Sequence, residues 1–151
     1  MRVRRTMFAA VLLLLPVAGA RAQYTVTQVQ PLAFGYLTQG ITEVVPYTDT
    51  FRRGVIAIDG GGNAFVRLIL PTSLTSTQGG TAIPLQFLTG DVASQESGKK
   101  VQAFDPAAST RVNHNKGTAL LFVGGRAVPA ANQRAGVYSA TMTIIVSLIM
   151  I

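Results

Sequence analysis

VYSATMTIIVSLIM, residues 137–150, alternates between two faces without interruption. One face is apolar throughout, and the other begins with serine and threonine and turns apolar toward its end. Side chains that alternate with a period of two are typical of a β-strand, whose successive residues point to opposite sides. We therefore predict a strand over Val137–Met150, with its apolar face in the core and both faces covered near its end. The apolar face consists of Tyr138, Ala140, Met142, Ile144, Val146, Leu148 and Met150.

Shorter segments of the same kind precede this stretch. They are rich in β-branched, aliphatic and aromatic residues, and Gly, Pro, Asn or Asp interrupts them every ten residues or so. This spacing predicts seven or eight strands in a single all-β domain, an immunoglobulin-like β-sandwich. The predicted earlier strands are Tyr24–Val29, Leu32–Leu37, Gly54–Asp59, Ala64–Leu70, Ile83–Leu88, Arg111–Asn113 and Thr118–Val123.

Three connections between these strands are predicted from composition. Gly60-Gly61-Gly62-Asn63 and Asn115-Lys116-Gly117 are short turn-forming runs, and each is expected to close a β-hairpin. The polar stretch from Asp91 to Ser109 is expected to be a long loop. No internal repeat and no second domain is evident.

Residues 1–22 have the three parts of a secretory signal peptide. Arg2, Arg4 and Arg5 precede an apolar run over Met7–Leu15, and Ala20-Arg21-Ala22 offers small residues for cleavage. The apolar run is much shorter than the roughly 20 residues of a membrane-spanning helix. An uncleaved anchor or a core helix is the alternative interpretation. The expected location of the protein is the periplasm, the cell surface or the extracellular medium.

Removal of residues 1–22 changes the charge balance of the chain. The full chain has a net charge of +7, whereas residues 23–151 carry nine basic and six acidic residues, a net charge of +3. The high isoelectric point is thus partly a property of the signal, and we expect no nucleic-acid partner. No membrane span is expected in the mature chain. Because there is no cysteine, neither a disulfide nor thiol chemistry is available.

No group of residues predicts a catalytic, cofactor-binding or metal site. Asp59-Gly60-Gly61-Gly62-Asn63 lacks the Lys-Ser/Thr of a phosphate-binding loop, and two oxygen side chains do not complete a calcium shell. His114 is the only histidine and lies between two turn-forming asparagines. We expect a glycine turn and a solvated histidine, and no enzymatic activity. The carboxylates are dispersed over turns and loops, at Glu43, Asp49, Asp59, Asp91, Glu96 and Asp105.

Several short segments resemble a bacterial secreted family, the domain of unknown function number 4402. The last similar segment is Asn132–Thr141, which resembles the Ala-Gly-x-Tyr pattern with which that family begins a terminal Thr/Val strand. It implies no catalytic residue. The other similar segments are Leu32-Ala33-Phe34-Gly35, Gly54–Gly60, Leu68-Ile69-Leu70-Pro71 and Phe122-Val123-Gly124-Gly125.

The closing pattern also resembles the last strand of pilins and of spore-coat-protein-U-like subunits, which are β-sandwiches of surface fibres. This resemblance implies a pilin-like sandwich. The chain departs from both groups because it has no cysteine, and from the pilins because it ends in Ile149-Met150-Ile151 without a penultimate tyrosine.

The expected function is that of a secreted structural or interaction protein of the cell envelope or surface, such as a fibre- or pilus-like subunit. Its expected partners are other envelope proteins or copies of itself, joined by strand addition. Tyr24–Val29 is either the first strand of its own sandwich or a donor arm for a neighbour. The alternative function is an envelope carbohydrate- or ligand-binding module, with Tyr47 beside Pro46 as its exposed aromatic. At most, Arg52-Arg53 and Lys99-Lys100 would tune binding to anionic polymers.

Overall fold

The structure is a computed structural model that describes residues 24–113 and 117–148. The predicted signal peptide, residues 1–22, lies outside this part of the chain. Every regular element in the described residues is a β-strand, so the all-β prediction is confirmed, with twelve strands where seven or eight were predicted. The strands are β1 (Thr25–Gln30), β2 (Glu43–Val45), β3 (Gly54–Asp59), β4 (Asn63–Ile69), β5 (Ser73–Leu74), β6 (Ile83–Gln86), β7 (Val92–Gln95), β8 (Gln102–Phe104), β9 (Thr110–Asn113), β10 (Ala119–Val123), β11 (Gly125–Ala127) and β12 (Thr143–Leu148).

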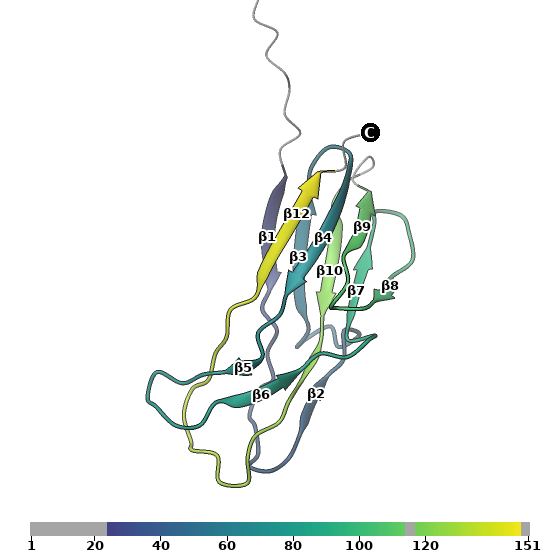
Figure 1. Ribbon diagram of the computed structural model, residues 1–151. Helices are drawn as coiled ribbons and strands as arrows, with labels where there is room; N and C mark the ends of the chain where they lie inside the picture. Colours follow the sequence, from purple (N-terminus) through teal and green to yellow (C-terminus); the bar gives the residue numbers. More distant parts are fainter. Residues whose placement is uncertain (1–23, 114–116, 149–151) are drawn as a thin grey trace, which may run out of the picture.

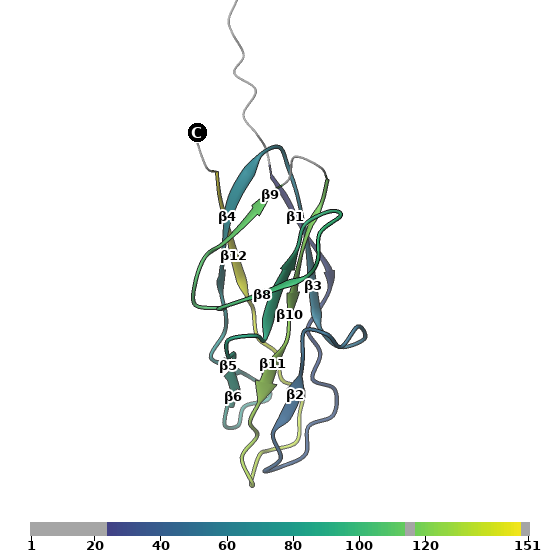
Figure 2. The ribbon, with the colours of Figure 1, turned by 90° about the vertical axis from the view of Figure 1, so that its right-hand side faces the viewer.

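These strands form three antiparallel sheets. A five-stranded sheet, β1-β3-β10-β7-β8, faces a three-stranded sheet, β12-β4-β9, and the four short strands β2-β11-β6-β5 form a further sheet at one end (Figures 1 and 2). The arrangement is consistent with the predicted β-sandwich. The described residues contain no helix long and apolar enough to cross a membrane.

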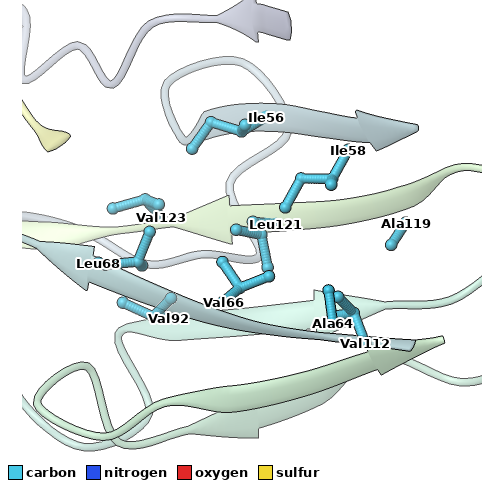
Figure 3. Packing of buried hydrophobic residues seen from close by; sticks show 10 residues of the cluster. All are labelled: Ile56, Ile58, Ala64, Val66, Leu68, Val92, Val112, Ala119, Leu121 and Val123. Carbon is cyan, nitrogen blue, oxygen red and sulfur yellow. The ribbon is translucent and has the colours of Figure 1, made fainter. Parts of the chain in front are cut away.

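The main core lies between the five-stranded and three-stranded sheets (Figure 3). β4 shows how the sequence builds it: Ala64, Val66 and Leu68 are buried, while the alternate residues Phe65 and Arg67 are exposed. The buried members of this cluster are Ile56, Ile58, Ala64, Val66, Leu68, Val92, Val112, Ala119, Leu121 and Val123.

The terminal strand is shorter than predicted; its inward face is confirmed for Met142, Ile144 and Val146, whereas Ala140, also predicted to be in the core, is exposed. β12 begins at Thr143 rather than at Val137, and it pairs with β4 along its length. Met142, Ile144 and Val146 pack against the main core. On the other face, Ile145 is 40% exposed, so the prediction that both faces are covered is wrong at this position, where no other described segment covers the sheet. Residues 149–151 are outside the described part.

Both predicted hairpins are wrong in the same way. Gly60–Gly62 connects β3 to β4, but β3 belongs to the five-stranded sheet and β4 to the three-stranded sheet. β9 and β10 likewise belong to different sheets (Figure 2), and residues 114–116 between them lie outside the described residues. In both cases the apolar faces of two consecutive strands come together from opposite layers.

Two other segments differ from the prediction. In Leu32–Leu37, Phe34 is buried but Tyr36 is fully exposed, and the segment is irregular and pairs with no strand in the described residues. Conversely, Asp91–Ser109 contains β7 and β8 instead of a long loop. β7 was missed because its buried residues, Val92, Ala93 and Ser94, are short and partly polar and are covered on both faces.

Gly124 allows two parts of the chain to approach closely. A Cβ atom at this position would lie 2.3 Å from the Val45 carbonyl oxygen and 2.7 Å from the Tyr47 amide nitrogen. The Gly124 amide also donates a 2.7 Å hydrogen bond to the Asp91 carbonyl. The junction of β10 and β11 therefore requires a residue without a side chain.

We predict that Gly124→Ala destabilises the protein by about 1–3 kcal/mol, because the added methyl group overlaps backbone atoms that cannot move independently. Urea denaturation followed by circular dichroism measures the change. Gly61→Ala is the matched control, since a Cβ there meets no atom within 4 Å. Equal effects of the two substitutions would contradict this role for Gly124.

Candidate functional site

A cavity of about 1010 Å³ opens where the sandwich meets the end sheet. The volume is at the upper end of the range typical of ligand-binding pockets, about 300–1,000 Å³. Gln28 of β1 lies on one side of the cavity, and residues 138–142, which lead into β12, lie on another. Its apolar wall includes Leu32, Phe34, Leu70, Ile83, Leu85, Phe87 and Met142. We call this cavity the seam groove.

The two long walls of the seam groove are irregular segments, residues 31–39 and 133–142. They are joined to one another at one end, where the Gly40 amide donates to the Ala130 carbonyl at 3.1 Å and Gln39 Nε2 donates to the Gln133 carbonyl at 2.5 Å. Phe34, Ile83 and other residues of a second apolar cluster form the floor. The groove is therefore held open between anchored segments.

Gln133 is the polar residue that fixes this end of the groove. Its side chain is buried, and Nε2 donates to the Thr81 carbonyl at 2.5 Å and lies 2.9 Å from the Tyr138 hydroxyl. Its Oε1 accepts from the Ala130 amide at 3.3 Å. The Tyr138 hydroxyl donates to the Arg134 carbonyl at 2.8 Å, so Tyr138, predicted to be buried, is half-buried and hydrogen-bonded.

The seam groove lies beside two open sheet edges. Among the described strands, β1 pairs only with β3, and β12 pairs only with β4. Both edges are on the same side of the sandwich, the left side in Figure 1. Neither β1, TVTQVQ, nor β12, TIIVSL, contains a charged residue or a proline. Charges and prolines normally protect edge strands from pairing with other chains, so these two edges are available for pairing.

Two of the six carboxylates named in the sequence analysis, Glu43 and Asp49, contact the same arginine. The guanidinium of Arg52 brings Glu43 and Asp49 together, at 2.5 Å and 2.8 Å. The hydrogen bond from the Arg52 side chain holds the pKa of Asp49 below its usual value, and the hydrogen bond to Glu43 raises the pKa of Arg52. This cluster ties β2 to the loop that follows it.

Three of the four side chains in the two basic pairs, Arg52, Arg53 and Lys99, have partners within the protein. Arg53 lies over the Phe122 ring, with 4.0 Å between its Cζ and the ring centroid, and donates to the Tyr47 carbonyl at 3.0 Å. Lys99 forms an ion pair with Glu96. Arg52-Arg53 is thus engaged within the protein instead of being presented as a pair to anionic polymers.

The glycine loop between β3 and β4 is a turn, as predicted. Gly62 has φ +106°, a conformation that favours glycine. The Tyr24 ring lies where a Cβ of Gly60 would be, at 2.3 Å, and the Tyr24 hydroxyl donates to the Gly61 and Asn63 carbonyls at 3.3 Å. The loop therefore holds the start of β1. Within residues 24–113 and 117–148, no three potential metal-ligating side chains come together; His114 is outside that part.

Tyr47, which the sequence predicted to be an exposed aromatic for sugar binding, is partly covered. Tyr47 is half-buried and packs against the cluster of Val55, Ala93 and Phe122 on the outer face of the five-stranded sheet. Tyr36, at the rim of the seam groove, is fully exposed. Neither its neighbours nor its spacing in the sequence distinguish Tyr36 from the other tyrosines.

We predict that Gln133→Met destabilises the protein by about 1–3 kcal/mol, because the Thr81 carbonyl loses its buried hydrogen-bond partner. Amide hydrogen exchange of residues 130–138 should accelerate in the same variant. Gln78→Met, at an exposed position, is the control. Unchanged exchange rates in Gln133→Met would contradict the assignment of Gln133 as the anchor of the groove.

One family model matches most of the chain. The family described as domain of unknown function (DUF4402) matches residues 38–147, which include every strand of the structure except β1 and the last residue of β12. No curated protein matches the chain, and no solved structure does. The similar segment Leu32–Gly35 lies before the matched region, whereas the other similar segments lie within it. The chain belongs to the DUF4402 family.

Proposed function

We propose that this protein is a secreted interaction protein of the bacterial cell envelope or surface. Its open β1 and β12 edges accept an extended segment from another envelope protein or from another copy of the chain. The observation that supports this proposal best is the pair of uncharged edges beside the seam groove. Backbone hydrogen bonds at a free edge supply affinity in strand addition, and pockets for alternate side chains supply specificity.

The free side of β12 is suited to receive such a segment. Met142, Ile144 and Val146 are only half-buried, although they pack against the main core. A strand added beside β12 would direct every second side chain toward these residues and toward the seam groove. Burial of a large aliphatic side chain there contributes about 1.5–3 kcal/mol, which adds to the backbone hydrogen bonds.

The first strand is similarly uncovered. β1 pairs with β3 from Thr25 opposite Asp59 to Gln30 opposite Val55. Its first five residues are nevertheless exposed, including Val26 at 43% and Val29 at 62%. The pairing within one chain favours β1 as the first strand of its own sandwich. Exchange of this strand between copies would make the protein a fibre- or pilus-like subunit, related in pattern to pilins and spore-coat-protein-U-like subunits.

Site-specific photocrosslinking in producing cells tests the proposal. A crosslinking residue at Thr27 on β1 or at Thr143 on β12 should give adducts of defined mass, either multiples of the chain or another envelope protein. Thr50, an exposed loop position, is the control and should give none. Adducts at Thr50 equal to those at the edges, or none at either edge, would overturn strand addition. Recovery of the chain in the cytoplasmic fraction would overturn export.

A disulfide distinguishes the two roles of β1. Thr27 and Ala57 are direct cross-strand partners, and the chain has no other cysteine to interfere. The Thr27→Cys/Ala57→Cys variant should form an intramolecular bond that leaves the chain monomeric on a non-reducing gel. A ladder of disulfide-linked multimers, absent from each single variant, would instead show that β1 is exchanged between copies.

A further inference from the structure

The outer face of the three-stranded sheet β12-β4-β9 is uncovered and carries large side chains. Phe65, Ile69 and Ile145 are 47%, 48% and 40% exposed. Arg67 and Arg111, which are also exposed, lie among them. We call these five residues the outer-sheet patch.

The strand register fixes the arrangement of this patch. Phe65 lies opposite Arg111 of β9 on one side and Ser147 of β12 on the other. Arg67 lies opposite Ile145. Phe65, Arg67 and Ile69 follow one another along β4, each about 6.8 Å from the next, because alternate residues of an antiparallel strand are two rises of about 3.4 Å apart. An aromatic ring thus has one arginine beside it and another after it along the strand.

Among the described arginines, Arg67 and Arg111 differ from the other four, whose guanidinium groups contact partners within the protein. Arg52 binds Glu43 and Asp49, Arg53 lies on Phe122, Arg126 lies near Asp91, and Arg134 donates to the Gln78 carbonyl. By contrast, neither Arg67 nor Arg111 has an ion pair or hydrogen bond with another described residue. Strands β4, β9 and β12 contain no carboxylate. The patch is therefore positively charged without compensation.

From this geometry we propose that the outer-sheet patch binds a linear anionic polysaccharide of the polyuronate class. Guanidinium groups bind carboxylates through paired, parallel hydrogen bonds. The exposed Phe65 ring offers a flat apolar surface to the apolar face of a sugar ring. The side chains of Phe65, Arg67 and Ile69 lie in line along β4, which suits an extended polymer whose sugar rings and carboxylates also repeat.

Other occupants fit this surface less well. A lipid bilayer would have to receive Phe65 and Ile69 together with Arg67 between them, which places a guanidinium in the apolar layer at a considerable cost. A second copy stacked face to face by a two-fold axis would bring the arginines of the two patches together, and like charges repel. An acidic polypeptide satisfies the charge but has no sugar ring for Phe65.

The inference is independent of strand addition, because the patch is on the face of the sheet and not on its edge. Isothermal titration of the full chain with polygalacturonate tests it. We expect binding that weakens as salt increases, and about tenfold or greater weakening in Arg67→Gln and in Arg111→Gln, since hydrogen bonds to charged groups contribute about 1.5–3 kcal/mol. Lys100→Gln removes the same charge from an exposed position elsewhere and should change the affinity less than twofold.

Further probes separate the polyuronate from other anions. Amylose, polyglutamate and phosphatidylglycerol vesicles should bind at least tenfold more weakly than polygalacturonate. Phe65→Ala should reduce the affinity for polygalacturonate and leave that for polyglutamate unchanged; Phe65→Leu serves if the alanine variant does not fold. Absence of polygalacturonate binding, equal loss in Lys100→Gln, or equally tight binding of polyglutamate or of the vesicles would overturn the proposal.

Discussion

Contact between the five-stranded and three-stranded sheets is the interaction on which the rest of this structure depends. The chain has no cysteine, so no disulfide links the layers, and the cluster from Ile56 to Val123 must hold them together. Its members come from β3, β7 and β10 on one side and from β4 and β9 on the other. Because consecutive strands such as β3 and β4 are in different layers, each crossing loop contributes directly to this packing.

The same division of strands leaves the first and last strands at open edges. β1 is an edge strand of the five-stranded sheet and β12 is an edge strand of the three-stranded sheet, on the same side of the sandwich. Neither carries the charges or prolines by which edge strands are usually protected. At one end of the seam groove next to them, the buried Gln133 side chain links Thr81 to residues 130–138. Uncharged edges beside a preformed groove are the basis of the proposal that the protein binds an extended partner.

The arginines divide into two groups with different physical roles. Arg52, Arg53, Arg126 and Arg134 bind carboxylates, a ring or a backbone carbonyl within the protein. Arg67 and Arg111 remain on the outer face of the three-stranded sheet beside Phe65. Because these two exposed guanidinium groups have no ion pair or hydrogen bond with another described residue, recognition of an anion is proposed for this face and not for the Arg52-Arg53 pair.

The sequence by itself determined the all-β class and the faces of the longer strands, because alternation with a period of two depends only on local backbone geometry. Thus the inward side of β12 and the alternation of β4 were predictable from residues 143–148 and 63–69. Only the tertiary structure decided which strands pair. The turns at Gly60–Asn63 and Asn115–Gly117 were predicted to close hairpins, since composition indicates a turn but not whether the chain stays in one sheet. The location of β7, the irregular path of Leu32–Leu37 and the seam groove were likewise not predictable, because each depends on neighbours distant in sequence.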